Sequence, residues 1–289
     1  MIREIFYSFR PKQWTKNLFI FSALIFDRQL TNSFSLITTL AGFLIFCALS
    51  SSVYLFNDLF DLEADKNHPT KKNRPIASGR LNISLAIVIA IFLGIVALCF
   101  AFLLSLDFFL ICLSYLLINL LYSKWLKHLP VIDVLIVASG FVLRVAAGVM
   151  LIAVERFSPW LYVVTTLLAL FMGFGKRRAE LALLAGSANQ HRTVFEGYTL
   201  DFLDQLITIV SGTTIIGYSL YTFSAPNLPA NHAMMLTIPF VLYGIFRYLY
   251  LIKVKESGGA PEELLMTDRP LQITILLWGL SVLIIFYLT

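Results

Sequence analysis

Charged residues are scarce in this chain, and their scarcity excludes a water-soluble protein. Lys, Arg, Asp and Glu make up 13% of the 289 residues, whereas 58% are hydrophobic and the mean hydropathy is +0.82. An ordinary soluble domain carries roughly 25% charged residues. The same composition excludes a disordered chain and a nucleic-acid-binding domain, although the net charge is +5. A basic balance in so apolar a chain is typical of positively charged cytosolic loops between membrane spans.

Cysteine is also scarce, with single residues inside apolar runs at Cys47, Cys99 and Cys112. Their spacing fits neither a disulfide scaffold nor a zinc site, so we expect three small buried hydrophobic residues. A glycine-rich nucleotide loop, a Ser-His-Asp set and a convincing internal repeat are also missing from the sequence. No cleavable signal peptide is expected, because the basic N-terminal residues precede a span without a small-residue cleavage site.

Long apolar runs dominate the chain and predict transmembrane helices. Such a helix needs about 20 mainly apolar residues. Nine windows of this kind cover residues 17–33, 34–56, 82–104, 107–123, 131–152, 158–176, 203–223, 233–252 and 270–288. The first is the weakest, because Asp27, Arg28 and Gln29 interrupt it near its end. We therefore expect an all-α, polytopic membrane protein with one integral domain over residues 1–289.

Lysine and arginine are distributed unevenly between the two sides of this topology. Short cytosolic loops hold the excess of these residues in membrane proteins. With the N-terminus in the cytosol and the C-terminus outside, 19 of the 22 lie on the inner side. Three inner connections, at about 57–81, 177–202 and 253–269, are long. Because functional groups concentrate on such loops, we expect the chemistry at this surface.

The second predicted span ends in a cluster of amide and carboxylate side chains. On a helix that advances about 100° per residue, four of them share one arc of about 100°. These four are Asn57, Asp58, Asp61 and Asp65, whereas Glu63 points away. Three carboxylates on one face repel each other unless a cation lies between them, and oxygen ligands without His or Cys favour Mg²⁺. The alternative is a solvated acidic helix end, which is costly so close to an apolar span.

The loop that follows this acidic face supplies the opposite charge. It contains Lys66, His68, Lys71, Lys72, Arg74 and Arg80. Carboxylates with a metal beside such a loop form a site suited to polyphosphate. The loop alone is equally typical of positive-inside topology, and only its adjacency to the acidic face favours the functional interpretation.

Further polar residues are expected on the same side of the membrane. They are Arg10, Lys16, Asn17, Tyr122, Lys124, Lys127, Asp133, Lys176, Arg177, Asp201, Asp204, Asp268 and Arg269. Each is also compatible with an interfacial anchor, and for Lys124 that interpretation is preferred. Asp201 and Asp204 share a helix face and offer a second, weaker set of oxygen ligands. Asp268 and Arg269 precede Pro270, which is typical of a helix start.

Arg144 differs from these residues because it lies deep in a predicted span. Eleven residues separate it from Asp133, which on a helix is about 16 Å. An intramembrane arginine normally faces a cavity or a partner side chain. Arg144 is therefore interpreted either as a functional residue or as a structural one.

Two motifs resemble those of the UbiA superfamily of intramembrane prenyltransferases. They are Asn57-Asp58-x-x-Asp61-x-x-x-Asp65 and Arg74-Pro-Ile-Ala-Ser-Gly79. Finer motifs are similar to the decaprenyl-phosphate phosphoribosyltransferase branch. They include Arg10-Pro-Lys-Gln-Trp-Thr-Lys16-Asn17, His68-Pro-Thr-Lys71, Gly175-Lys-Arg-Arg-Ala-Glu180 and Asp268-Arg-Pro-Leu-Gln272. The resemblance covers essentially the whole chain.

The resemblance implies a UbiA-like bundle of nine helices with a central cavity open to the cytosol, in the inner (plasma) membrane. It implies Mg²⁺-dependent transfer of 5-phosphoribose from phosphoribosyl pyrophosphate to a polyprenyl (decaprenyl-type) phosphate. Pyrophosphate is released, and the product leads to an arabinose donor for cell-wall arabinogalactan.

The residues expected to do this fall into three sets. The metal set is Asn57, Asp58, Asp61 and Asp65. The catalytic set is Asp58, Asp61, Lys71, Arg74, Tyr122, Lys127 and Arg144. The substrate-binding set is Lys16, Asn17, Asn57, His68, Asp133, Lys176, Arg177, Asp201, Asp268 and Arg269.

Two other functions stay open at this point. An aromatic prenyltransferase of the same fold uses a prenyl diphosphate donor and carries a second Asp-x-x-x-Asp motif, where this chain has Asp201-x-x-Asp204. A cation-coupled transporter is expected to have charged or broken helices near the midplane and often repeat symmetry, whereas here only Arg144 lies deep. No nucleic-acid partner is expected, and the sequence leaves open whether the chain forms a homo-oligomer.

Overall fold

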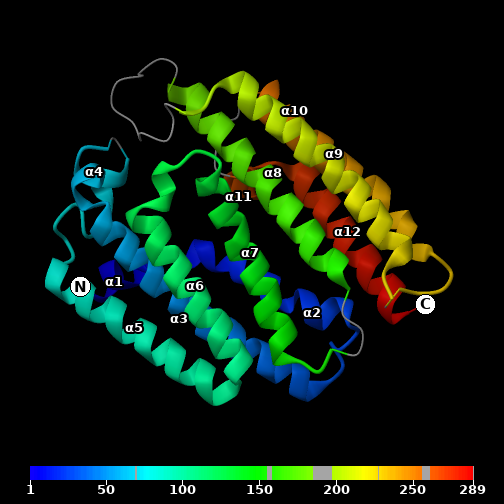
Figure 1. Ribbon diagram of the computed structural model, residues 1–289, viewed down its shortest axis with the longest axis horizontal. Helices are drawn as coiled ribbons and strands as arrows, with labels where there is room; N and C mark the ends of the chain where they lie inside the picture. The colour runs from blue at the N-terminus through cyan, green and yellow to red at the C-terminus, as the bar shows by residue number, and fades with distance from the viewer. Residues whose placement is uncertain (69, 155–157, 185–196, 227, 256–260, 289) are drawn as a thin grey trace. The chain divides into compact units, whose positions relative to one another are not determined.

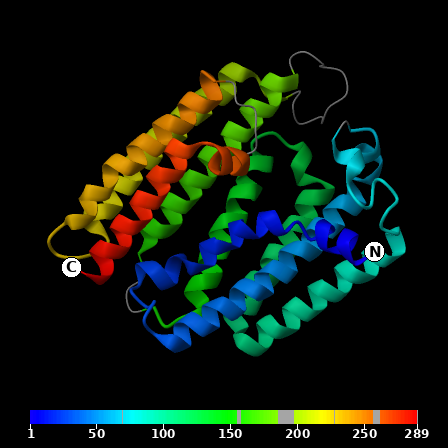
Figure 2. The same ribbon diagram turned by 180° about the vertical axis from the view of Figure 1, so that it is seen from behind.

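The computed structural model describes residues 1–68, 70–154, 158–184, 197–226, 228–255 and 261–288. Within these ranges every regular element is a helix and no strand occurs, which confirms the all-α prediction. Figure 1 labels the helices, and Figure 2 shows them from behind. Eight helices in the described part are long and apolar enough to cross a membrane. The chain is a multi-pass membrane protein.

The first of two compact units combines residues 1–25, 29–127 and 143–154. Its elements are α1 (Ile2–Ser8), the 3-10 helix η1 (Pro11–Ile20), α2 (Phe21–Phe26), α3 (Ser33–Phe60), α4 (Leu62–Lys66), η2 (Lys71–Asn73), α5 (Ile83–Leu104), α6 (Leu106–Lys124), η3 (Leu126–His128) and the C-terminal part of α7 (Ile132–Leu151). Helices α3, α5 and α6 pack against one another (Figure 1). Asn32 and Asn82 cap α3 and α5, because each side chain accepts hydrogen bonds from two N–H groups of the first turn.

Small residues allow elements of this unit to approach closely. The Ser52 hydroxyl on α3 donates to the Ala90 carbonyl on α5 at 2.7 Å, and a side chain at Gly94 would press on that serine. Such interhelical hydrogen bonds stabilise packing in membranes, where apolar burial between helices contributes little. Gly148 on α7 faces the Ile20 carbonyl so closely that any Cβ would collide with it.

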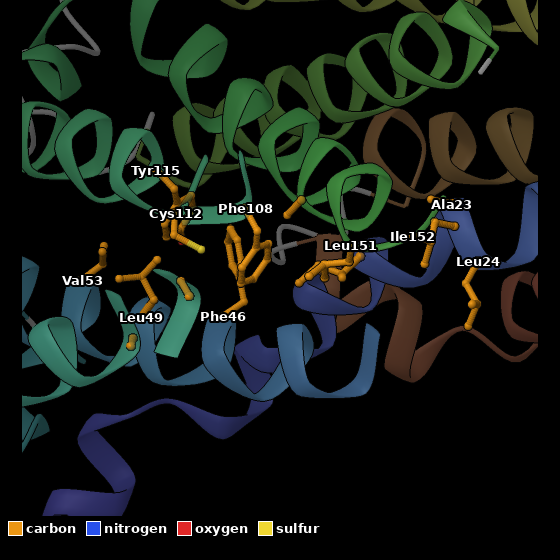
Figure 3. Packing of buried hydrophobic residues seen from close by; sticks show 14 residues of the cluster. Ala23, Leu24, Phe46, Leu49, Val53, Phe108, Cys112, Tyr115, Leu151 and Ile152 are labelled. Atoms are coloured by element: carbon orange, nitrogen blue, oxygen red, sulfur yellow. The ribbon is translucent and has the colours of Figure 1, made fainter. Parts of the chain in front are cut away.

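An aromatic and aliphatic cluster fills the interior of the first unit (Figure 3). Phe46 on α3 packs against Phe108 and Tyr115 on α6, with ring centroids 6.3 and 4.9 Å apart. Leu49, one turn nearer the end of α3, and Cys112 lie in the same cluster and are fully buried. This packing fixes the position of α3, whose last turn carries Asn57 and Asp58.

The second unit combines residues 26–28, 128–142 and 155–289. Its described elements are the N-terminal part of α7, α8 (Pro159–Leu184), α9 (Leu200–Ser224), η5 (Ala233–Thr237), α10 (Ile238–Lys253), α11 (Pro261–Thr267) and α12 (Arg269–Tyr287). Helix α8 packs on α9, and α10 packs on α12. Helix α12 begins as the sequence predicts, with Asp268 as its N-cap and Pro270 in its first turn.

The first predicted span, residues 17–33, differs from the other eight. Here the structure has η1 followed by the six-residue α2, and neither is long enough to cross a membrane as one continuous helix. The interruption falls where the sequence places charge: Arg28, just after α2, lies in the left-handed region with φ 57°. The described part therefore contains eight continuous spans and one broken apolar segment.

The sixth predicted span is longer than expected. It was placed at residues 158–176 with a loop from 177, whereas α8 continues to Leu184, so Lys176–Glu180 is helical. Lys, Arg and Glu are good helix formers, which explains why a charged run does not end the helix. Residues 185–196 of the predicted loop 177–202, and residues 256–260 of the predicted loop 253–269, lie outside the described residues.

The prediction of three buried cysteines is wrong at one position. Cys47 and Cys112 are buried, but Cys99 on α5 is exposed. Helix α5 is apolar on all sides, so its sequence does not distinguish the face that packs on α3 from the face left uncovered. The single-domain organisation and the sidedness of the chain stay predictions.

Candidate functional site

The predicted acidic face lies where α3 gives way to α4. Helix α3 ends at Phe60 and α4 begins at Leu62, so Asp61 lies between them, but helical hydrogen bonding continues across this residue. The Asp61 N–H donates to the Asn57 carbonyl at 2.9 Å, and the Asp65 N–H donates to the Asp61 carbonyl at 2.8 Å. The turn-by-turn stacking of the four side chains is therefore retained. Asp58 and Asp65 are buried, whereas Glu63 is exposed.

Two arginines hold the buried carboxylates of this face. Asp58 accepts hydrogen bonds from Arg10 and from Nη1 of Arg74, the latter at 3.0 Å. The same Nη1 donates to Oδ2 of Asp65 at 2.6 Å. Charge-assisted pairs of this kind are about twice as strong as neutral hydrogen bonds. The basic loop and the N-terminal segment thus close on one pair of carboxylates.

Asp61 is held by a different cation. Its Oδ1 accepts from Nζ of Lys127, and its Oδ2 accepts from Nδ2 of Asn57 at 3.3 Å. The Lys127 side chain is 5% exposed, which is rare for lysine unless it is paired. The three carboxylates therefore face three cationic side chains of the same unit, and we call these six side chains the ion-pair cluster.

Oxygen ligands from three successive turns suit a hard divalent cation. In this conformation, however, those oxygens bind guanidinium and ammonium groups. Among the described residues, no group of three His, Cys, Asp or Glu side chains is arranged to hold a metal ion. The donor chemistry thus fits such a cation, but its entry requires some of the ion pairs to open.

Arg10 belongs to the ion-pair cluster, although the sequence analysis assigned it no place in the three sets of site residues. Its backbone lies in the left-handed region, with φ 53° and ψ 61°, directly before Pro11. Its guanidinium group lies over the Tyr54 ring, 5.1 Å from the centroid, and Tyr54 is one helical turn before Asp58. A non-glycine residue in this region costs about 1–2 kcal/mol, and such strain concentrates at functional sites. The motif that begins at Arg10 was the signal in the sequence, but it did not identify Asp58 as the partner of this arginine.

Four other predicted site residues of the first unit lie outside the ion-pair cluster. Nδ1 of His68 accepts from the N–H groups of Thr70 at 3.2 Å and Lys71 at 3.3 Å, so the imidazole shapes the loop. Lys71 begins η2 and is half-buried, as are Lys16 and Tyr122. Their roles in binding substrate stay predictions.

Arg144 and Asn17 form a second buried network in the first unit. Nε of Arg144 donates to Oδ1 of Asn17 at 2.8 Å, and Nη2 donates to the Tyr115 hydroxyl at 2.9 Å. Nδ2 of Asn17 in turn donates to Sγ of Cys47 and to Oγ of Ser50, both at 3.3 Å. The guanidinium group also lies 4.9 Å from the Tyr115 ring centroid. These contacts favour the structural interpretation of Arg144 and bring two predicted site residues together.

Asp133 and Arg177 form a buried pair in the second unit. Nε of Arg177 donates to Oδ2 of Asp133 at 2.6 Å, and its Nη1 donates to Glu180 at 2.6 Å. The Tyr198 hydroxyl donates to Oδ1 of Asp133 at 2.7 Å and accepts from the Val131 N–H at 2.6 Å. Burial, and then the hydrogen bond to Asp133, raise the pKa of Tyr198 above its usual range. Tyr198 is a member of this network that sequence reasoning placed in a loop without a role.

The two predicted oxygen ligands near the start of α9 differ in their surroundings. Oδ1 of Asp204 accepts from Nε of Arg178 at 2.7 Å and from Nζ of Lys253 at 3.2 Å, which joins α8, α9 and α10. Nη1 of Arg178 also donates to the Ile252 carbonyl at 2.9 Å. Asp201, three residues earlier on α9, is exposed. Asp204 therefore acts as a structural tie between helices.

Asp268 caps the N-terminus of α12 and pairs with an arginine of α10. It accepts from the Leu271 N–H at 2.9 Å and forms a two-point ion pair with Arg247, whose Nη2 lies 2.8 Å from Oδ2. The hydrogen bond from Arg247 holds the pKa of Asp268 below its usual range. Arg269 is exposed at the start of α12. The predicted role of this pair of residues in binding substrate stays untested.

Comparison with known proteins identifies the family of the chain. Residues 18–267 match the UbiA prenyltransferase family. The chain belongs to that family. Its membership makes it a membrane transferase and confirms the resemblance of the Asn57–Asp65 motif.

Curated relatives within the UbiA family are similar over nearly the whole chain. A decaprenyl-phosphate phosphoribosyltransferase of Corynebacterium glutamicum is 33% identical, over 96% of this chain and 85% of the relative. The protein of the same name from Mycolicibacterium smegmatis is 32% identical, over 93% and 88%. A digeranylgeranylglyceryl phosphate synthase of Thermococcus sibiricus is 39% identical, but over only 35% of this chain and 36% of the relative.

Solved UbiA homologues share the fold. A homologue from Archaeoglobus fulgidus bound to GPP and Mg²⁺ superposes with a TM-score of 0.76, at 20% identity, over 98% of this chain and 99% of that chain. The same homologue bound to Cd²⁺ gives a TM-score of 0.72 at 20% identity, over 98% and 99%. The fold thus accommodates divalent cations in related proteins.

Proposed function

We propose that this UbiA-family chain transfers the 5-phosphoribosyl group of phosphoribosyl pyrophosphate to a polyprenyl phosphate of the decaprenyl type. The observation that carries the proposal is the 31–33% identity to decaprenyl-phosphate phosphoribosyltransferases over almost the full length of the chain. The ion-pair cluster supports it, because a donor with a diphosphate group needs both carboxylates for a metal and cations for its phosphates.

In the proposed reaction the bond between ribose C1 and the pyrophosphate oxygen breaks, and pyrophosphate leaves with the electron pair. A bond forms between C1 and an oxygen of the lipid phosphate. That oxygen is already largely ionised near pH 7, because the second pKa of a phosphate monoester is about 6. The reaction therefore needs no strong general base, which agrees with a sequence that lacks a catalytic triad.

The residues of the ion-pair cluster would orient the donor and stabilise the leaving group. Asn57, Asp58, Asp61 and Asp65 would hold Mg²⁺, which when bound neutralises charge that develops on pyrophosphate as it departs. Arg74 and Lys71 would bind donor phosphates from the loop after α4. Lys127 and Tyr122, in the same unit, would orient the phosphate of the acceptor.

The proposal includes a place in the cell. The chain would lie in the inner (plasma) membrane with its basic side toward the cytosol, where phosphoribosyl pyrophosphate is available. Its product would be a lipid-linked ribose phosphate that precedes the arabinose donor of cell-wall arabinogalactan. The polyprenyl tail of the acceptor would lie along the apolar helices, in contact with the bilayer.

The competing activity is that of an aromatic prenyltransferase with a prenyl diphosphate donor. The spacing argues against it, because this chain has Asp201-x-x-Asp204 in place of an Asp-x-x-x-Asp motif, and Asp204 pairs with Arg178 and Lys253. Purified protein is incubated either with ribose-labelled phosphoribosyl pyrophosphate and decaprenyl phosphate, or with labelled geranyl diphosphate and 4-hydroxybenzoate. We expect labelled lipid from the first mixture and no prenylated aromatic from the second. The reverse result contradicts the proposal.

A further inference from the structure

Two arginines cover the buried carboxylates of the ion-pair cluster, and we infer that they change partners when the donor binds. Arg10 and Arg74 leave Asp58 and Asp65 to a divalent cation and bind the diphosphate of the donor instead. The inference rests on the proposed function for the identity of that donor, but it requires only a diphosphate. It assigns a diphosphate-binding role to Arg10.

The layering of the side chains supports this exchange. The side chains of Arg10 and Arg74 are 25% and 23% exposed, whereas those of Asp58 and Asp65 are 3% and 4% exposed. The guanidinium groups therefore lie on the accessible side of the carboxylates. An arriving anion can contact the arginines, and a metal ion that binds the paired oxygens of Asp58 and Asp65 must displace them.

The charges of the exchanging groups match. One divalent cation carries the same charge as the two guanidinium groups that it replaces on Asp58 and Asp65. The two released arginines then carry that charge to an anionic diphosphate. When a metal ion binds alone, the exchange leaves two partly buried guanidinium groups without their carboxylate partners, which opposes binding of the metal. Metal and diphosphate are therefore expected to bind cooperatively, each weakly without the other.

Arg10 is held so that it stays at the site after Asp58 is released. Its guanidinium group lies over the Tyr54 ring, and this contact does not involve the carboxylate. Pro11, which follows directly, restricts the backbone next to Arg10, whose own backbone lies in the left-handed region. The arginine can thus turn from a carboxylate to a phosphate without a large movement of the chain.

The test measures binding of Mn²⁺ and inorganic pyrophosphate to the purified full chain, with no turnover. Free Mn²⁺ is followed by its electron paramagnetic resonance signal, corrected for the complex that Mn²⁺ and pyrophosphate form in solution. In the wild type, pyrophosphate is expected to tighten Mn²⁺ binding at least about tenfold, within the range typical of coupled sites. Equal affinity with and without pyrophosphate would overturn the inference, whatever the variants do.

Arg10→Gln removes one of the two competing cations. We expect it to bind Mn²⁺ alone about tenfold more tightly than the wild type and to lose about tenfold of the tightening by pyrophosphate, a coupling of about 1.4 kcal/mol. Arg10→Lys keeps the charge and should resemble the wild type in binding Mn²⁺ alone. The matched control is Arg80→Gln, because Arg80 pairs with Glu4 at 3.2 Å outside the cluster, and it should change neither affinity.

A merely structural Arg10 predicts a different pattern. Arg10→Gln would then melt at a lower temperature and bind Mn²⁺ as weakly as the wild type or more weakly, and that result would overturn the inference. Failure of the proposed function is distinguishable from this outcome. If phosphoribosyl pyrophosphate is not a substrate but Mn²⁺ and pyrophosphate respond as expected, the exchange stands and the donor assignment is wrong.

Discussion

Replacing Arg144 by methionine separates the two interpretations of this intramembrane arginine. The side chain is 4% exposed and donates to Asn17 and to Tyr115, whose ring also lies 4.9 Å from the guanidinium carbon. Methionine fills much of the same volume without the charge. If Arg144 holds the first unit together, the variant loses stability, whereas a substrate-binding arginine should lose affinity or turnover with stability retained.

The structure sets the size of the effect. Each hydrogen bond from the charged group is worth about 1.5–3 kcal/mol, and the desolvated contact with the aromatic ring about 2 kcal/mol. Replacing the arginine also removes the cost of holding a charge in the membrane interior, which is about 2.5–3.5 kcal/mol. The lost hydrogen bonds and ring contact outweigh the removed cost of the charge, so Arg144→Met should destabilise the protein by about 3 kcal/mol.

Equilibrium unfolding in mixed micelles measures this change. Tyr115→Phe removes one acceptor of Arg144 and keeps the ring, so it completes a double-mutant cycle with Arg144→Met. We expect a coupling of about 1–2 kcal/mol between these two sites, because they share a hydrogen bond. Unchanged stability in Arg144→Met, together with a large rise in the KM of the lipid acceptor, would refute the structural interpretation.

Three further predictions concern other parts of the molecule. Asp61→Ala should abolish metal-dependent turnover in a protein that still folds, with a lower melting temperature because the buried Lys127 loses its partner, whereas Glu63→Ala, on the outward side, should keep full turnover; activity in the first variant would contradict the metal assignment. Tyr198→Phe should lower the unfolding free energy by about 2 kcal/mol, because Asp133 and the Val131 N–H lose their shared partner; unchanged denaturation would contradict this tie. Asp268→Asn should be less stable than the wild type above about pH 3.9, the ordinary aspartate pKa, and the two melting temperatures should converge as pH falls through the lowered pKa of Asp268; a constant difference would show that its charge contributes nothing.

Local periodicity was sufficient to predict the acidic face. The positions of Asn57, Asp58, Asp61 and Asp65 follow from helical geometry, and the structure keeps them in register across the break at Asp61. Their partners could not be predicted in the same way. Lys127 lies 66 residues from Asp61 in the sequence, and only the packing of the first unit brings the two side chains together.

Clusters of basic residues predicted the ends of the membrane spans less reliably, because such residues have more than one structural role. The run Lys176–Arg178 suggested the end of a span, but it continues α8 because Arg177 and Arg178 are paired with Asp133 and Asp204. An arginine that is paired inside the protein and one that marks a cytosolic loop look the same in a sequence. Partners on other helices decide between these roles, and they become visible only in the fold.

The two units use their ion pairs differently. In the second unit, Asp133 is fully buried and pairs with Arg177, whose side chain is 6% exposed, so this pair acts as a fixed tie. In the first unit, the partly exposed Arg10 and Arg74 lie over buried carboxylates. Partly exposed cations can exchange partners at lower cost than buried ones, because water solvates them during the change. This difference is why we assign the donor to the cluster at the end of α3.

The fate of the donor phosphates tests the proposed reaction most directly. Phosphoribosyl pyrophosphate is prepared with ³²P either in its 5-phosphate or in the terminal phosphate of its pyrophosphate group, and each is incubated with the purified chain, Mg²⁺ and decaprenyl phosphate. We predict that label from the 5-phosphate enters the lipid extract and that label from the pyrophosphate group stays in the aqueous phase. Pyrophosphate label in the lipid, or no lipid label from either donor, would contradict phosphoribosyl transfer.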